Sequence, residues 1–434
     1  MDIKKTLAAT MVSLTGLVAW SSGFGLYEPS AKYHALGGAV VGKAVDASAN
    51  FANPATLTDL TNFEVTVGFV TEHPRGTVDI SRNNSDLGEY KMDPGLFWLP
   101  HLMLAAPLPY DFTFGLGISA EYGLGTRYPD NWPMKWSCTE TTVQGLVINP
   151  NLAYKITDKW SVAAGLRWLY FDFEQYRDMT VPVYYHPLTG KPLYYGYNQY
   201  RLKGDNGWDG FGWQIGTKYD ILDNLSVGLM YKAQIETTIE GQTTATPHDY
   251  TSKFDTGLAQ GLTGAADADI TLPQSVTFGV NYDPYEDWHV GLAFSWTEWS
   301  QFDQLIFNIP QGNPFVKEAT PTTLNWKDTW RGSLGVAWDF ADDWTWMVSY
   351  TYDMDSTSCD QASAMLPPAS RHIVATGFSW YIGCGFEATL SYSCIFMNGF
   401  DMYATDSKGG TGRYNLETER GFCHAGGFSI TYRF

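Results

Sequence analysis

Period-two alternation of residue types is clearest over residues 326–353, which read WKDTWRGSLGVAWDFADDWTWMVSYTYD. Trp330, Leu334 and Trp338 alternate with small or polar residues before Asp342-Asp343, and a second alternating series follows these acids. Successive side chains of a β-strand point to opposite sides, so this period predicts two strands, each with one apolar face and one polar face. The two acids are typical of a tight turn, and they predict a short connection between the strands.

The same alternation returns along most of the chain, for example over residues 276–282, 290–296, 386–396 and 428–434. A soluble β-sandwich would also alternate. Two features favour a membrane protein: Trp and Tyr stand at the strand ends, as in the aromatic girdles of barrels, and the other face is Gly, Ser, Thr, Lys, Arg or Asp. A polar second face indicates a wet lumen. We therefore predict an all-β fold, a transmembrane antiparallel β-barrel.

The composition excludes several other classes of protein. The chain has 434 residues, of which 46 are acidic and 27 are basic, and its formal net charge is −19. A nucleic-acid-binding protein needs a basic stripe for phosphates, so we expect no nucleic-acid partner. Aromatic residues make up 16% of the chain and charged residues only 17%, whereas disordered chains lack aromatic residues and are highly charged.

The first 21 residues have the pattern of a secretory signal peptide. Lys4 and Lys5 precede a mostly apolar run that ends on Ala19-Trp20-Ser21. The alternative is a transmembrane anchor, but the run is shorter than the ~20 residues that a helix needs to cross a bilayer. We predict export with cleavage after Ser21, and a barrel in the bacterial outer membrane.

Short and long connections alternate between the predicted strands. Short turns fall near residues 158–160, 223–225, 287–288 and 342–344. Long connections fall near residues 77–97, 122–141, 178–207, 240–268, 308–324, 357–368 and 398–415. This is typical of an outer-membrane barrel with short periplasmic turns and long external loops, here of about fourteen strands. The alternating end of the chain, closing on Phe434, resembles the C-terminal assembly signal of such proteins and predicts contact with the barrel-assembly machinery.

Residues 22–60 show no strand alternation and are rich in Gly and Ala. A stretch of ~40 residues without strands is long for a loop or terminus, and its low charge argues against a disordered tail. The segment is therefore either a small periplasmic cap or a plug inside the lumen. The predicted organisation is a signal peptide (1–21), an N-terminal plug (22–60) and a barrel (61–434).

Several motifs resemble the FadL family, outer-membrane transporters for long-chain fatty acids with relatives that import aromatic hydrocarbons. The motifs are Ser22-Gly23-Phe24, Asn53-Pro54-Ala55, Glu121-Tyr122-Gly123-Leu124 with Thr126, Tyr128 and Trp132-Pro133, Trp208-Asp209-Gly210-Phe211-Gly212-Trp213, Leu272-Pro273-Gln274-Ser275-Val276, and Trp296-Thr297-Glu298-Trp299-Ser300-Gln301-Phe302. Each is weak alone, but their number and order make the resemblance specific over residues 22–434.

The resemblance implies a monomeric fourteen-stranded barrel that is closed by an N-terminal hatch. Asn53, Pro54 and Ala55 match the motif at the end of the hatch. It also implies that substrate, caught by external loops, enters a lumenal pocket and leaves sideways through a gap where the third strand kinks inward. That strand is expected at about residues 112–122, and the glycines within and just after it are compatible with a bend.

Two aromatic connections are candidates for the capture of substrate. The first, residues 122–141, carries Tyr122, Tyr128 and Trp132, and the second, residues 178–207, carries Tyr184, Tyr185, Tyr194 and Tyr195. Burial of an alkyl chain is worth ~0.8 kcal/mol per CH₂, so a capture groove needs apolar area. The alternatives are loops that pack on themselves and girdle residues at the lipid interface.

A carboxylate head group would require a cation in the lumen or at its rim. Arg177 and Lys327 are our candidates, with Arg331 and Arg127 as others, and simple lumenal salt bridges are the alternative for each. By resemblance, Phe24 and Leu26 lie where the N-terminus meets the ligand, against the alternative of ordinary plug packing. The choice between a fatty acid and an aromatic hydrocarbon stays open.

The five cysteines give no CxxC and no zinc pattern, and we expect no metal site. Cys394 shares the apolar parity of its strand, whereas Cys423 is out of phase with Phe428, so the two are expected on opposite faces and unable to bridge. We expect the five cysteines, Cys384 included, to be mostly free, buried thiols, and a disulfide between Cys138 and Cys359 is possible.

No enzyme motif is present: the sequence has no HExxH, G-x-S-x-G, Walker A or Rossmann fingerprint. We therefore expect no catalytic residue and no cofactor. The expected partners are a hydrophobic small molecule and outer-membrane lipids. A general diffusion porin or a surface adhesin is the alternative from another class, although an open porin has no need for a plug.

Overall fold

The structure is a computed structural model that describes residues 23–93, 95–185, 187, 192–247, 263–302, 304–305, 322–323, 326–357, 369–405 and 413–434. The predicted signal peptide and Cys359 lie outside the described residues. The helices are α2 (Ala31–Ala35), α3 (Ala49–Ala52), η1 (Pro54–Asp59) and η2 (Trp299–Gln301). The strands are β1 (Glu64–Arg82), β2 (Ser85–Met92), β3 (Phe97–Pro107), β4 (Phe112–Arg127), β5 (Glu140–Thr157), β6 (Trp160–Tyr185), β7 (Pro192–Asp205), β8 (Gly210–Leu222), β9 (Leu225–Lys232), β10 (Ile235–Pro247), β11 (Gly264–Leu272), β12 (Ser275–Tyr285), β13 (Trp288–Thr297), β14 (Gln304–Leu305), β15 (Thr322–Thr323), β16 (Thr329–Ala341), β17 (Trp344–Asp353), β18 (Arg371–Gly383), β19 (Phe386–Thr405) and β20 (Arg413–Arg433).

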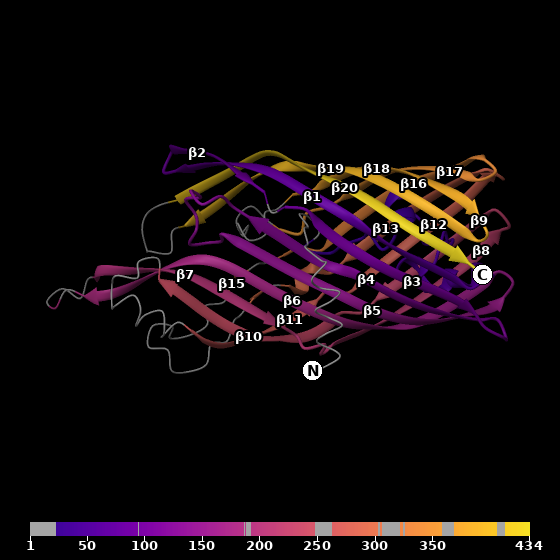
Figure 1. The fold of residues 1–434 in the computed structure, drawn as a ribbon, viewed down its shortest axis with the longest axis horizontal. Coiled ribbons are helices and arrows are strands. Elements are labelled where there is room, and N and C mark those ends of the chain that lie inside the picture. Colours follow the sequence, from indigo (N-terminus) through magenta and orange to yellow (C-terminus); the bar gives the residue numbers. More distant parts are fainter. Residues whose placement is uncertain are drawn as a thin grey trace.

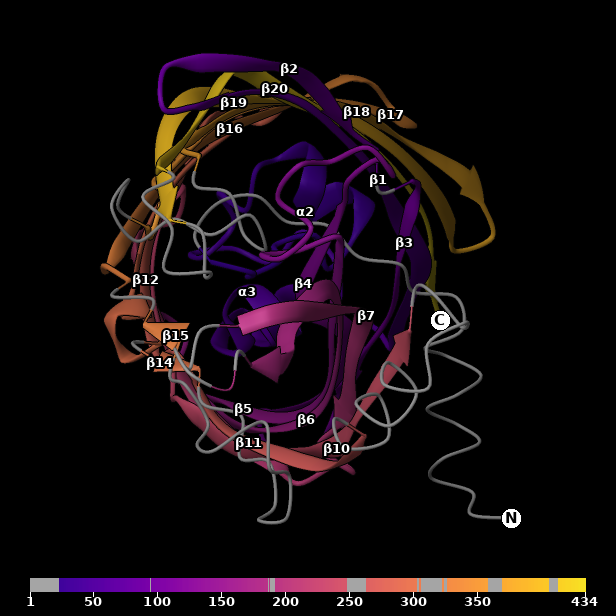
Figure 2. The ribbon, with the colours of Figure 1, turned by 90° about the vertical axis from the view of Figure 1, so that its left-hand side faces the viewer.

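The described strands close into a ring of antiparallel neighbours, as expected for a barrel (Figures 1 and 2). Around the ring run β1, β3, β4, β5, β6, β8, β9, β12, β13, β16, β17, β18, β19 and β20, and β20 pairs with β1. β2, β7, β10 and β11 extend the wall at the end with the long connections, on the left in Figure 1. Among the described residues, no helix has the length and apolar character needed to cross a bilayer.

The alternation read from residues 326–353 is confirmed in β16 and β17. Arg331 and Ser333 are buried on the inner face, whereas Trp330, Leu334 and Tyr350 are exposed on the outer face. Aromatic pairs ring the outer wall, with stacked Trp side chains at the short-turn end and a stacked Phe–Trp pair farther along. A barrel in lipid needs such an apolar band, because every backbone group is already paired between strands.

Several of the predicted long loops contain strand extensions. β1 and β2 pair as a hairpin within residues 77–97, and β6 pairs with β7 within residues 178–207. β10 and β11 also pair within residues 240–268, and β19 and β20 pair within residues 398–415. The prediction of irregular loops there was wrong, because a polar and Tyr-rich composition does not prevent the antiparallel ladder from continuing beyond the membrane.

The cysteines lie as the alternation predicts. Cys423 is buried on the inner face of β20, and Cys394 lies on the more exposed side of β19. Cys138 and Cys384 are also free thiols.

Residues 23–60, here called the N-terminal segment, lie inside the ring, where α2 and α3 are visible through its open end (Figure 2). The segment rests directly on inward-facing glycines of the wall, which we call the glycine seat: its backbone meets Gly228, Gly291 and Gly335, and side chains of Asn50 and Asn53 meet Gly115 and Gly216. A Cβ on Gly291 would lie 1.8 Å from the carbonyl oxygen of Ala39, and a Cβ on Gly228 would lie 2.0 Å from that of Val41. The segment therefore fits only because these wall positions have no side chain.

Side-chain amides fasten the segment to this seat. The amide nitrogen of Asn53 donates to the carbonyl oxygens of Val41 (2.8 Å) and Thr217 (3.0 Å), and its amide oxygen accepts from the N–H of Ala55. Asn53 thereby caps η1, which begins at Pro54, so Asn53-Pro54-Ala55 ends the segment by a specific turn.

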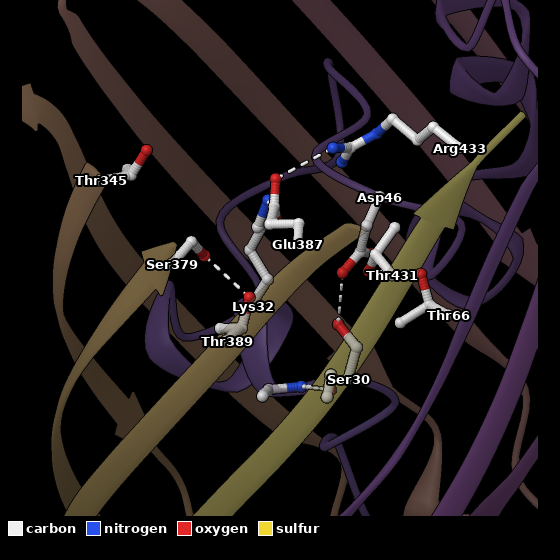
Figure 3. A network of polar contacts seen from close by, with 12 residues as sticks. Ser30, Lys32, Asp46, Thr66, Thr345, Ser379, Glu387, Thr389, Thr431 and Arg433 are labelled. Atoms are coloured by element: carbon white, nitrogen blue, oxygen red, sulfur yellow. Dashed lines mark hydrogen bonds and ion pairs between the residues drawn. The ribbon is translucent and has the colours of Figure 1, made fainter. Parts of the chain in front are cut away.

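Three ion pairs tie the segment to the short-turn end of the barrel. Lys32 pairs with Glu387, Lys43 with Asp283, and Asp59 with Lys218. Figure 3 shows the first of these sites, where Glu387 also meets Arg433 at 3.0 Å. Nearby, the hydroxyl of Ser30 donates to Asp46. The body of the segment is thus held at three places around the ring.

The glycine seat makes a direct prediction. We expect Gly291→Ala to push Ala39 off the wall, because overpacking of this kind costs about 1–3 kcal/mol. Amide hydrogen exchange over residues 36–42 should accelerate. The matched control is Gly332→Ala, where the new Cβ would meet only the Phe294 ring at 3.9 Å. Equal exchange in the two variants would contradict the seat.

Candidate functional site

β4 leaves the wall halfway along its length. Its pairing with β3 ends at His101–Ser119, and its pairing with β5 shifts register between Ala120 and Tyr122. From Ser119 to Thr126 every residue is buried, so both sides of the strand face protein. Nearer the end with the long connections, a hydrogen bond from the N–H of Asp93 to the carbonyl of Arg127 (3.3 Å) joins the two sides of the wall again. The described wall therefore has a gap in strand pairing between these two levels.

Gly115 and Gly117, whose bending the sequence allowed, do not form this irregularity. It falls at Glu121, whereas Gly115 and Gly117 lie lower, where the wall touches Asn50 of the N-terminal segment. A bulge needs one extra residue in one strand, which a residue such as Glu121 supplies as readily as a glycine.

The first described residues of the N-terminal segment pair with the displaced part of β4. The N–H of Gly123 donates to the carbonyl of Phe24 (2.8 Å), and the N–H of Leu26 donates to the carbonyl of Glu121 (2.9 Å). Gly25 and Tyr122 form the bridge between them. The backbone groups that β4 withdraws from the wall are thus partly satisfied by the segment itself.

Phe24 is the centre of an aromatic cluster. Its ring lies 5.0 Å from Trp299, 5.3 Å from Phe302, 5.9 Å from Trp326 and 6.0 Å from Phe171. Edge-to-face pairs at such distances are worth about 0.5–1.5 kcal/mol each beyond burial. The cluster therefore holds the start of the segment by apolar contact.

A cavity of about 70 Å³, the upper cavity, lies between this end and the wall. Tyr27, Tyr33 and Phe51 line it from the segment, and Tyr122 and Trp299 line it from the other side. It is smaller than the cavity of about 150 Å³ that holds benzene in an engineered protein. An alkyl chain of many carbons therefore needs part of this lining to move.

Three cations face the upper cavity, with one carboxylate among them. Arg167 contacts Glu121 at 2.7 Å, and Lys232 contacts the same carboxylate at 3.3 Å. Arg331 lies 4.2 Å above the ring of Tyr27 and 3.5 Å from Asp353. Buried cations of this kind must be paired, and here Glu121 serves two of them.

Burial changes the protonation of the segment's own groups. It raises the pKa of Tyr27 to about 12, with help from the charge of Asp353, and it raises the pKa of Glu28 against the opposing charge of Arg331. Burial, together with the charge of Arg331, lowers the pKa of His34 to about 4. The two ring nitrogens of His34 meet the hydroxyls of Ser391 (2.9 Å) and Ser393 (2.8 Å), so a neutral imidazole fits this place.

The structure brings only some of the predicted ligand residues together. Leu26 and Tyr122 line the upper cavity, and the ring of Phe24 lies 6.0 Å from that of Tyr122. Tyr128 and Trp132 are buried and stacked on each other at 4.0 Å, the self-packing given as the alternative for this connection, and a role of these residues in capture stays a prediction. The side chains of Tyr184, Tyr185, Tyr194 and Tyr195 lie outside the described residues.

The two predicted carboxylate-binding cations lie elsewhere. Arg177 is half-buried on the extended part of β6, with its guanidinium 5.4 Å from the centre of the Tyr200 ring. Lys327 was expected on the lumenal face, but its side chain is exposed, because regular pairing of β16 begins only at Thr329. Arg331, two residues after the start of β16 at Thr329, does face the upper cavity. Arg127 is exposed beside Glu140.

Sequence reasoning missed Arg167 and Lys232. Arg167 follows the exposed Leu166 in an alternating strand, so its inward parity was readable. Its meeting with Glu121 was not, because the irregularity that turns β4 inward depends on contacts far along the chain. Among the described residues, no group of His, Cys, Asp and Glu could hold a metal ion.

Comparisons with known proteins agree with this architecture. The profile of the family described as "Outer membrane protein transport protein (OMPP1/FadL/TodX)" matches residues 12–434. The chain is 26% identical to the long-chain fatty acid transport protein of Escherichia coli O6:H1, with 96% of this chain and 95% of that protein covered.

Two solved structures share the fold. A Pseudomonas aeruginosa FadL homologue superposes with a TM-score of 0.80 at 20% identity, covering 95% of this chain and all (100%) of that one. The Ralstonia pickettii toluene transporter TbuX superposes with a TM-score of 0.66 at 17% identity, covering 95% and 98%.

The pKa of His34 predicts acid release of α2. The unfolded imidazole titrates at about 6.5 and the folded one at about 4, so the stability that neutral His34 contributes is complete above pH 6.5 and is lost as the pH falls towards 4. Amide exchange of residues 31–38, corrected for the intrinsic pH dependence, should accelerate over this range. His34→Gln, which cannot titrate, is the control, and an identical pH response in both proteins would refute this role.

Proposed function

Because the chain belongs to the outer membrane protein transport protein family (OMPP1/FadL/TodX), we propose that this outer-membrane transporter takes up long-chain fatty acids as its main substrates. The observation that carries the proposal is the position of the Phe24 end. Gly25 and Leu26 line the upper cavity, two backbone hydrogen bonds join Phe24 and Leu26 to the displaced part of β4, and apolar contacts hold the Phe24 ring. Substrate that displaces Phe24 reaches both the cavity and the gap.

The charges of the upper cavity favour a carboxylate head group. Arg167, Lys232 and Arg331 face it, whereas Glu121 is its one lining carboxylate among the described residues. A charge-assisted hydrogen bond is worth about 1.5–3 kcal/mol, so an incoming carboxylate gains more from these cations than a neutral ligand does. The apolar chain would replace Phe24 against Trp299, Phe302 and Phe171.

Release is lateral in this proposal. The gap between β3 and β4 opens the wall at the level where Tyr122 and Leu124 turn inward. Leu96 and Trp98 are exposed on the outer side of the same level, so an apolar path continues towards lipid. The body of the segment stays on the glycine seat, and residues 23–29 are the part that shifts.

A second candidate substrate is an aromatic hydrocarbon. The observation that favours it is the cluster of aromatic rings around Phe24, which would take a flat ring as readily as an alkyl chain. TbuX of Ralstonia pickettii, which shares this fold, is a toluene transporter. In either case the protein acts as a monomer without a cofactor, and Phe434 serves its assembly into the membrane.

The fatty-acid proposal predicts a head-group-specific effect. We expect Lys232→Gln to weaken the binding of hexadecanoic acid by about 10- to 100-fold, the value of one charge-assisted hydrogen bond. Arg167 would still neutralise Glu121 in this variant. Isothermal titration measures the affinity.

Two comparisons sharpen that test. Hexadecan-1-ol, with the same chain and no charge, should bind the wild-type protein and Lys232→Gln alike. Lys159→Gln, in an exposed turn, should bind the acid as the wild type does. Equal loss of acid and alcohol would point to an aromatic hydrocarbon or to damage of the fold, and it would count against the carboxylate site.

The closed lumen predicts the electrical behaviour of the protein. In planar bilayers the intact protein should show no steady conductance, whereas deletion of residues 22–50 should open a large pore. A steady open pore in the intact protein would favour the porin alternative and overturn the transporter mechanism.

A further inference from the structure

A second cavity, the lower cavity, lies on the opposite side of the N-terminal segment from the upper one. It measures about 240 Å³ and opens at the short-turn end of the barrel. Leu36, Val40 and Val45 line it from the segment, and Ala337 and Met347 line it from β16 and β17. Leu36, Val40, Ala337 and Met347 are all buried, so the floor of the cavity is apolar.

One turn of the segment separates the two cavities. Gly37 and Gly38 line the upper cavity, whereas Leu36, Ala39 and Val40 line the lower one. Gly37 and Gly38 have φ values of +60° and +79°, which favour glycine, and the turn rests on the glycine seat at Gly335. The lower cavity is therefore a separate compartment and not an extension of the upper one.

The charges at the rim of the lower cavity are balanced. Lys43 pairs with Asp283, and Lys32 pairs with Glu387. His289 stands between Asp283 (2.7 Å) and Asp339 (3.2 Å), so each carboxylate there already has a donor. Asn281 holds the segment rather than a ligand, since its amide donates to Ala39 and accepts from Gly42. Unlike the upper cavity, this rim offers no surplus of cations to an anion.

We propose that the lower cavity is a second binding site, one for a small uncharged apolar molecule of the size of a substituted benzene or a short alkane. An enclosed apolar cavity of about 150 Å³ binds benzene, and the lower cavity, which is open at its polar rim, offers a larger volume above its apolar floor. Because its rim charges are satisfied within the protein, a carboxylate would have to break an existing ion pair to enter. Selectivity therefore runs opposite to that of the upper cavity.

This site goes beyond the proposed uptake of fatty acids and does not depend on it. Its ligand reaches it from the short-turn end, without displacement of Phe24. The ligand also packs on Leu36 and Val40, which stabilises the turn between the two cavities. A ligand in the lower cavity should therefore change the affinity for a fatty acid little or not at all. It should not compete with the acid for a site.

The test uses fluorobenzene as the probe and the full chain in lipid nanodiscs, with empty nanodiscs as the blank. A bound ¹⁹F resonance is expected with the wild-type protein. Ala337→Leu, which fills the cavity, should weaken binding at least fivefold, and Met347→Gln, which makes its floor polar, should do so without filling it. Both variants should bind hexadecanoic acid as the wild type does, which also shows that they fold.

The matched control is Ala293→Leu, which adds the same atoms to the lining of the upper cavity. It should leave the fluorobenzene resonance in place. Saturating hexadecanoic acid should not displace the probe either. Absence of a bound resonance, its displacement by the acid, or its loss in Ala293→Leu but not in Ala337→Leu and Met347→Gln would each overturn the lower site. None of these results would bear on the carboxylate site.

Discussion

The close contact between the N-terminal segment and the inward glycines of the wall organises the rest of this molecule. Carbonyl oxygens of Ala39 and Val41 lie where side chains of Gly291 and Gly228 would otherwise stand. A barrel of this size would enclose an aqueous channel if its interior were not filled. The glycine seat allows a segment with only short helices to fill it by backbone contact, and it sets the height at which the lumen is divided into two cavities.

The N-terminal segment is held by stronger contacts along its body than at its Phe24 end. This difference allows one part of the plug to move while the rest keeps the barrel closed. The body carries three ion pairs, the Asn53 cap and the glycine contacts, whereas residues 23–26 are held by a few backbone bonds and by the rings around Phe24. Apolar contacts can be replaced by an apolar ligand at little net cost, but a buried ion pair cannot. The chemistry of the contacts thus separates a fixed floor from a displaceable end.

The alternation of apolar and polar residues predicted the barrel, because each strand of the wall has one face towards lipid and one towards the lumen, whatever loops follow it. The position of Phe24 followed from the family resemblance, since nothing in its neighbours along the chain indicates the rings of Trp299 and Trp326. The irregularity at Glu121 escaped prediction, because it exists only where β4 loses β3 and gains residues 24–26 as partners. The extended hairpins were also missed, since composition alone does not separate a polar loop from a polar strand. Lys327 was assigned to the lumenal face from its odd position in the alternation. Such an assignment holds only within a paired strand, and β16 begins two residues later, at Thr329.

The central claim is that the Phe24 end must leave β4 for substrate to pass. The most direct measurement is uptake of labelled hexadecanoic acid by Gly25→Cys/Tyr122→Cys, made in a background without the five native cysteines. These two positions face each other across a β-bridge, within reach of a disulfide. The account predicts that oxidation abolishes uptake and that reductant restores it. Undiminished uptake by the fully oxidised protein would contradict it.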